Sequence, residues 1–93
     1  MDFEVQHEEG NKYYAVIDGS EAAVGYFKLD DETLDFQHTY VPEKLRGQGV
    51  AEKLVRHALD DARRRRLRVL PSCPYVKRFV ERHPEYQQGL ARA

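Results

Sequence analysis

The sequence contains a single cysteine, no tryptophan and no long apolar run among its 93 residues. One cysteine cannot form an internal disulfide, so a reducing compartment, the cytoplasm, is predicted. No segment approaches the apolar length needed to cross a bilayer, and Met1–Glu4 lacks the basic and apolar regions of a signal peptide. A chain of this length can bury one small core. We therefore expect a single domain over residues 1–93, with no membrane partner.

The chain also lacks a large excess of charge of either sign, but its two halves carry opposite net charges. Residues 1–43 hold 11 acidic and 2 basic side chains, a balance of −9, whereas residues 44–93 hold 5 acidic and 13 basic side chains, a balance of +8. The basic half would suit an anionic cofactor and the acidic half a cationic amine. Runs such as Arg63–Arg66, however, are more often simply solvated. The overall balance of −1 argues against nucleic-acid binding.

Two of the few glycines, Gly47 and Gly49, lie between a predicted strand over Leu34–Val41 and a predicted helix over Val50–Arg66. Glycine lets the backbone approach a ligand closely and adopt angles closed to other residues. The first amides of a helix have no internal partner and carry partial positive charge, which suits phosphate. The segment Arg46–Ala51 therefore predicts a phosphate-binding loop, and the alternative is a tight turn without a ligand. Neither a dinucleotide-binding motif nor a P-loop is present.

Alternating apolar residues predict four short strands before Pro42, with Asp18-Gly19 as a hairpin signal and Gly25 as a candidate bulge. After Pro42 the apolar spacing becomes helical. The predicted class is α+β, a mixed, mostly antiparallel sheet with a β-α-β crossover and a C-terminal helix. The expected strands are Phe3–His7, Tyr13–Ile17, Ala23–Leu29, Leu34–Val41 and Leu67–Leu70, and the expected helices are Val50–Arg66 and a second from Pro74 that Pro84 ends, with frayed residues after it.

Three sequence blocks carry a family resemblance. They are His38-Thr39-Tyr40-Val41-Pro42, the pattern Arg46-x-x-Gly49-x-Ala51, and Pro71-Ser72-Cys73-Pro74-Tyr75-Val76. Together they resemble the GNAT superfamily of acetyl-CoA-dependent N-acetyltransferases, and within it the small, single-domain YjdJ-like branch. The resemblance implies a minimal GNAT fold with acetyl-CoA as co-substrate and no metal. It assigns the backbone of Val41 to pantetheine, and the CoA pyrophosphate to Arg46, Gly47, Gln48, Gly49, Val50 and Ala51.

Cys73 is the sharpest candidate for chemistry. If Pro74 is the first helical residue, Cys73 is the N-cap, where the helix dipole and free amides stabilise a nucleophilic thiolate. The alternative is a small buried hydrophobic side chain, which is the usual role of a free cysteine. The family resemblance implies an active thiol at this position.

His38 is the predicted partner of this thiol, because histidine titrates near neutrality and can accept a proton from a thiol or an ammonium group. Alternation places His38 on one face with Leu34, Phe36 and Tyr40, so the alternative is a histidine of the core. Tyr75 is expected at the cofactor, with its hydroxyl near the departing CoA sulfur; the alternative is an aromatic that only packs at the helix start.

Together with the family resemblance, these observations predict an acetyl-CoA-dependent N-acetyltransferase that acts on an unidentified small-molecule or protein amine. The amine attacks the thioester directly, or through an acetyl-Cys73 intermediate with His38 as base. The alternatives are a non-catalytic acyl-CoA-binding module and a protein-interaction domain. Larger members of the superfamily carry two helices between their first two strands, where this chain has only a tight turn. The acceptor side is therefore expected to be open or completed in a homodimer.

Overall fold

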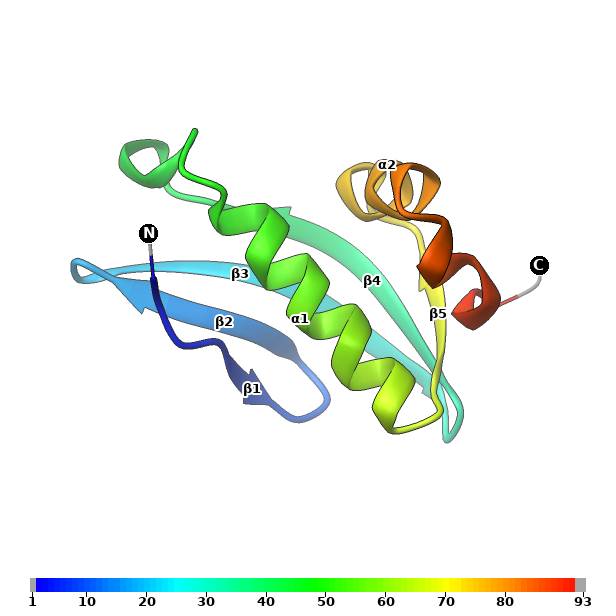
Figure 1. Cartoon of the computed structure of the whole chain (residues 1–93). Helices are drawn as coiled ribbons and strands as arrows, with labels where there is room; N and C mark the ends of the chain where they lie inside the picture. Colours follow the sequence, from blue (N-terminus) through cyan, green and yellow to red (C-terminus); the bar gives the residue numbers. More distant parts are fainter. Residues whose placement is uncertain (1, 92–93) are drawn as a thin grey trace.

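The computed structural model of the chain describes residues 2–91. Its five-stranded sheet has the order β1-β2-β3-β4-β5, so each strand lies beside its neighbour in sequence (Figure 1). The first four strands pair antiparallel, and β4 pairs with β5 in parallel. The strands are β1 (Gln6–Glu8), β2 (Lys12–Ile17), β3 (Ser20–Asp30), β4 (Thr33–Tyr40) and β5 (Arg68–Pro71). This arrangement confirms the predicted α+β class.

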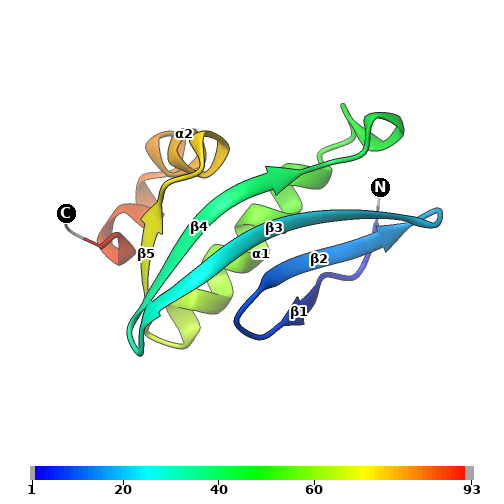
Figure 2. The same ribbon diagram turned by 180° about the vertical axis from the view of Figure 1, so that it is seen from behind.

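Helices α1 (Val50–Arg64) and α2 (Pro74–Arg82) form the second layer. α1 makes the predicted crossover from β4 to β5, and a short 3-10 turn, η1 (Glu43–Leu45), precedes it. Both helices join one core cluster with the sheet, whereas no described helix covers the opposite face, which we call the helix-free face (Figure 2). None of the described helices is both long and apolar enough to span a membrane.

A β-bulge in β4 decides which side chains reach the core. Gly25 pairs with His38 but Tyr26 pairs with Phe36, so Gln37 is an extra residue in the strand. The register shift lies beside Gly25, but the extra residue belongs to β4 and not, as predicted, to the strand of Gly25, and it reverses the alternation along β4. Phe36 is buried, whereas His38 is exposed, and its ring would lie 2.6 Å from a Cβ added at Gly25. The expected face shared by Phe36 and His38, and with it a core histidine, is therefore wrong.

The segment after α2 is folded, against the expectation of frayed residues. Pro84–Gly89 forms a 3-10 helix, η2, and Leu90 makes a parallel bridge with β5. Tyr86 is buried, and its hydroxyl donates to Asp60 of α1 at 2.7 Å. Because proline at the first helical position does not need an N–H, Pro84 ends α2 and also begins η2. Residues 92–93 lie outside the described part of the chain.

The strand boundaries and the end of α1 differ from the predictions by up to three residues. α1 ends at Arg64 because Arg66 turns into the left-handed region, with φ of 59°. β1 spans only Gln6–Glu8 and does not reach back to Phe3. Phe3 instead packs beside the smaller core cluster, and its ring centroid lies 4.4 Å from Nζ of Lys53. Neither the earlier end of α1 nor the shorter β1 changes the path of the chain around the loop that precedes α1.

Candidate functional site

A cleft of about 630 Å³ opens between the loop after β4, the start of α1 and one side of α2. It brings together two segments far apart in the sequence. Gln48 is not among its lining residues and instead donates from Nε2 to the carbonyl of Lys44 at 3.3 Å. His38 and Cys73 do not line it either. The predicted site residues that do line it are Val41, Arg46, Gly47, Gly49, Val50, Ala51 and Tyr75.

The loop leaves backbone amides free at the start of α1. Gly47 and Gly49 adopt φ angles of 79° and 78°, in the left-handed region that favours glycine. Gly49 is the N-cap of α1, and no side chain of the described residues caps the helix there. Apart from chain neighbours, no atom of the described residues lies within 4 Å of a Cβ built on either glycine. The start of α1 is therefore uncapped, positively polarised and sterically open, which suits a phosphate group.

The end of β4 borders the cleft, and on the β5 side it has no strand partner within the described part of the chain. Pairing between β4 and β5 ends at Phe36 and Pro71, whereas β4 continues to Tyr40 and Val41 lines the cleft. An extended ligand can pair with such a free strand edge. The carbonyl of Val41 accepts a hydrogen bond from Nε of Arg46 at 3.0 Å. A ligand that donates to this carbonyl would therefore have to displace Arg46 from it.

Arginines dominate the charge of the cleft. Arg46 approaches from the loop, and Arg78 and Arg82 approach from α2. The acidic side chain among the lining residues, Glu52, forms an i,i+4 ion pair with Arg56 at 3.7 Å. The net charge of the lining is therefore positive, as expected for a site that takes an anionic ligand.

Cys73 is the N-cap of α2, as predicted, and Pro74 is the first helical residue. The side chain of Cys73 makes no capping hydrogen bond, is 4% exposed and belongs to the main core cluster. Its Sγ lies 3.4 Å from Oγ1 of Thr39, and its backbone N–H donates to the carbonyl of Phe36 at 2.8 Å. These contacts match the small buried hydrophobic role more closely than that of an accessible nucleophile.

The structure does not bring His38 and Cys73 together. Thr39 contacts Cys73 on the helix side of the sheet, and consecutive strand residues point to opposite faces. His38 therefore lies on the helix-free face, beside Gly25. No hydrogen bond or ion pair joins His38 to Cys73 within residues 2–91, so the predicted base and thiol do not form a pair there.

Tyr75 lies in the first turn of α2, half-buried in the wall of the cleft. Burial raises the pKa of its phenol, and the carboxylate of Glu52 raises this pKa further. The hydroxyl is therefore protonated at neutral pH and can donate a hydrogen bond or a proton into the cleft.

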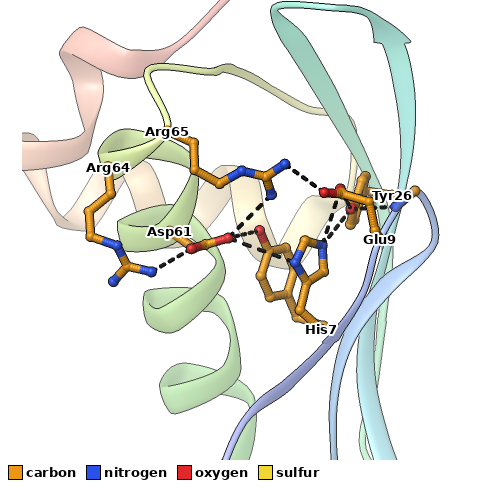
Figure 3. Close-up of polar contacts among 8 residues, drawn as sticks. His7, Glu9, Tyr26, Asp61, Arg64 and Arg65 are labelled. Atoms are coloured by element: carbon orange, nitrogen blue, oxygen red, sulfur yellow. Dashed lines mark hydrogen bonds and ion pairs between the residues drawn. The ribbon is translucent and has the colours of Figure 1, made fainter.

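A separate polar cluster lies at the opposite end of α1 (Figure 3). His7 stacks on Tyr13 with ring centroids 4.0 Å apart, and its Nε2 lies 2.6 Å from the hydroxyl of Tyr26. The hydroxyl of Tyr13 donates to Asp61 of α1 at 2.5 Å. Glu9, Arg64 and Arg65 complete this His7 cluster. The cluster connects the first three strands to the end of α1 and does not reach the cleft.

Burial shifts the titration of the His7 cluster. It lowers the pKa of His7 below its usual 6.5 and raises the pKa values of Tyr13 and Tyr26. For Asp61, burial opposes ionisation, but the hydrogen bonds from Tyr13 and Arg64 outweigh it and lower the pKa. His7 is therefore neutral and Asp61 charged near neutral pH. Neither here nor elsewhere in residues 2–91 do three or more His, Cys, Asp or Glu side chains gather to hold a metal ion.

Apart from Tyr75, sequence reasoning missed the part of the cleft wall that α2 supplies. The signal that could have found it is spacing, because Tyr75, Arg78 and Arg82 recur at intervals of three and four residues and so share one helix face. The cleft residues that were not predicted are Leu45, Glu52, Arg78, Phe79, Arg82 and His83.

Comparison with known proteins agrees with this architecture. The model of the GCN5-related N-acetyl-transferase family matches residues 12–89, which include the loop and both helices. Among solved structures, the chain is similar to the solution NMR structure of a GCN5-like protein from Staphylococcus aureus. The two share 30% sequence identity with a TM-score of 0.76, over 98% of this chain and 90% of the other.

The chain is also similar in sequence to vertebrate proteins named Protein NATD1. The Danio rerio protein is 32% identical over 91 residues, which covers 92% of this chain and 83% of the relative. The Homo sapiens protein is 30% identical over 83 residues, which covers 86% of this chain and 74% of the relative. The similarity therefore extends over most of both chains.

Proposed function

The chain belongs to the GCN5-related N-acetyl-transferase family, and from this premise we propose that it transfers an acetyl group from acetyl-CoA to an amine. The observation that carries the proposal is the cleft at the start of α1. There the uncapped amides, the free edge of β4 and the hydroxyl of Tyr75 surround one space. This combination suits a long ligand with a phosphate-bearing part and an extended arm.

In this proposal the amides of residues 47–51 and the guanidinium of Arg46 bind the pyrophosphate of the co-substrate. The open space beside Gly47 and Gly49 supports this assignment, because a side chain there would fill the room that a phosphate needs. The backbone at Val41 pairs with the pantetheine arm along the free edge of β4. Gln48 contributes its backbone amide, since its side chain is engaged with Lys44.

Acetyl-CoA supplies an activated thioester: the amine nitrogen bonds to its carbonyl carbon, the carbon–sulfur bond breaks, and the nitrogen loses a proton. We assign to Tyr75 the donation of a proton to the departing sulfur, after which solvent reprotonates the phenolate. The raised pKa of Tyr75 keeps this proton in place before the reaction. A cationic amine releases one proton to solvent before its nitrogen can attack, and the proton lost after the attack also passes to solvent. The acidic balance of residues 1–43 supports a cationic amine as the acceptor.

We favour direct attack over an acetyl-Cys73 intermediate, because Cys73 is 4% exposed and contacts Thr39 instead of His38. The observation in favour of the covalent route is the position of Cys73 at the N-cap of α2. Mass spectrometry of protein mixed with acetyl-CoA and no acceptor separates the two routes. Direct attack predicts unmodified Cys73, and an acetyl group on Cys73 that a later amine removes would establish the covalent route.

Calorimetric titration with acetyl-CoA tests the site itself. We expect the wild-type protein to bind and Gly49→Glu to lose binding, because the variant places a side chain and a negative charge at the start of α1. Gly10→Glu is the matched control, since Gly10 also has a left-handed φ (81°), has open space around it and lies in the turn after β1. Both variants place a side chain at a left-handed φ and add the same negative charge.

The outcome separates the proposal from its alternatives. Loss of binding in Gly49→Glu but not in Gly10→Glu, with turnover of an amine by the wild type, supports the transferase. Equal binding by both variants would contradict the site. Tight binding without turnover of any amine would indicate an acyl-CoA-binding module. No binding at millimolar acetyl-CoA would leave the protein-interaction alternative.

A further inference from the structure

The cleft continues past the loop along one face of α2. Tyr75, Arg78 and Arg82 line it on successive turns, and His83 lines it just beyond the helix. The ring of His83 packs against that of Phe79 at a tilt of 31°, with centroids 4.2 Å apart. The cleft therefore extends beyond the start of α1. Its part along α2 is lined by cations and by the aromatic pair of His83 and Phe79.

The two arginines of α2 differ from those of α1 in their partners. Arg56, Arg63, Arg64 and Arg65 of α1 and its C-cap each form an ion pair with an acidic side chain. Within residues 2–91, Arg78 and Arg82 form none, and both are exposed at the cleft. These two unpaired guanidinium groups lie one helical turn apart on one face of α2. Together they form a positively charged site with two separate donors.

This site matches a part of the co-substrate that the loop does not accommodate. The amides at the start of α1 suit the pyrophosphate, but coenzyme A carries a further phosphate monoester on the 3′ oxygen of its ribose. A phosphate monoester carries up to two negative charges, and guanidinium groups bind such groups by paired, charge-assisted hydrogen bonds. Beside Arg82, the half-buried ring of His83 lies against buried Phe79 and can offer a face on which an adenine base stacks.

We propose that Arg78 and Arg82 bind the 3′-phosphate of coenzyme A and make the protein select acetyl-CoA over its 3′-dephospho form. The proposal rests on the proposed function, since it concerns another part of the same ligand. It assigns α2 a role in recognising the nucleotide, separate from the role of Tyr75 near the thioester.

Calorimetry with acetyl-CoA and with acetyl-3′-dephospho-CoA tests the assignment. We expect the wild-type protein to bind acetyl-CoA about tenfold or more tightly than the dephospho form, as for a lost charge-assisted hydrogen bond. Arg78→Gln and Arg82→Gln should each weaken binding of acetyl-CoA and leave binding of the dephospho form unchanged. Lys77→Gln is the control, because Lys77 is exposed on the same helix but does not line the cleft.

Each result bears on a different claim. Equal wild-type affinity for both ligands would overturn the role of Arg78 and Arg82 while leaving the proposed function in place. The same loss in Lys77→Gln as in the two arginine variants would also overturn it, because only the general charge of α2 would then matter. If neither ligand binds the wild-type protein, the proposed function fails and this assignment fails with it.

Discussion

At the scale of single residues, Gln37 decides where two predicted catalytic side chains lie. As the extra residue of the bulge in β4, it places Thr39 against Cys73 and moves His38 to the helix-free face. Without the bulge, His38 would share the face of Phe36 and approach the core beside Cys73. One residue therefore separates the two groups that the sequence suggested as a pair.

The separation leads to a prediction for catalysis. Cys73→Ala and His38→Ala should each keep acetyl transfer within about threefold of wild type, because neither side chain lines the cleft and the two do not touch. Tyr75→Phe, which removes the hydroxyl in the cleft, should lower kcat about 10²-fold. Steady-state kinetics with a reactive amine measures all three. A loss of more than about 10²-fold in Cys73→Ala, with fold and acetyl-CoA affinity unchanged, would contradict direct attack.

Protonation of His7 makes the free energy of unfolding depend on pH below neutrality. Burial holds the pKa of His7 below 6.5 in the folded state, so the unfolded chain binds the proton first as the pH falls. The contribution of neutral His7 to the free energy of unfolding is complete above about pH 6.5 and is lost as the pH falls through the folded-state pKa. Asp61 and Glu9 have lowered pKa values, so both stay ionised over most of that range.

We therefore expect the urea midpoint of the wild-type protein to fall between about pH 7.5 and about pH 5. His7→Gln retains a polar side chain beside Tyr26 but does not titrate, and its midpoint should fall less over the same range. Urea unfolding followed by circular dichroism at a series of pH values measures both. Parallel pH profiles for the two proteins would show that His7 is not the group responsible.

At the scale of elements, η2 departs most from the prediction, because residues expected to be frayed are folded there. It follows α2 directly, and Tyr86 places a buried ring against Phe79, with centroids 5.8 Å apart. Leu90 then pairs with β5 next to the core. η2 thus covers the end of α2, the helix whose other side forms the cleft wall.

Tyr86→Ala should lower the free energy of unfolding by about 3 kcal/mol, because it removes a buried ring and leaves a cavity. Tyr86→Phe should cost only about 1 kcal/mol, since it loses the hydrogen bond to Asp60 and keeps the ring. Urea unfolding of the two variants gives both values. Costs below about 0.5 kcal/mol for Tyr86→Ala would show that η2 does not pack as described.

Elements were predictable where local signals agree with tertiary packing. The strands from Tyr13 onward, α1 and α2 follow from apolar periodicity and from Pro74 and Gly49 at the helix starts. The face of His38 was not predictable, because it depends on a pairing register between β3 and β4. The fold of η2 was not predictable either, because its short polar sequence is fixed by the contact of Tyr86 with distant residues.

At the scale of the whole molecule, α1 connects two ends with different chemistry. Its start forms the open, positively charged cleft, and its end joins the His7 cluster, in which most charges are paired. The helix-free face carries exposed apolar side chains, among them Val16, Phe27 and Tyr40. The expectation of an open or dimer-completed acceptor side stays a prediction. The central claim, that the chain binds acetyl-CoA, concerns only the cleft at the start of α1.

The most direct test of that claim is a heteronuclear NMR titration of the uniformly ¹⁵N-labelled protein with acetyl-CoA. We predict that the largest amide shifts occur at residues 46–51 and at Val41, with further shifts in α2 at Arg78 and Arg82. The amides around His7 should not move, because they lie at the opposite end of α1. Saturating shifts confined to another surface, or no shifts at millimolar acetyl-CoA, would contradict the account.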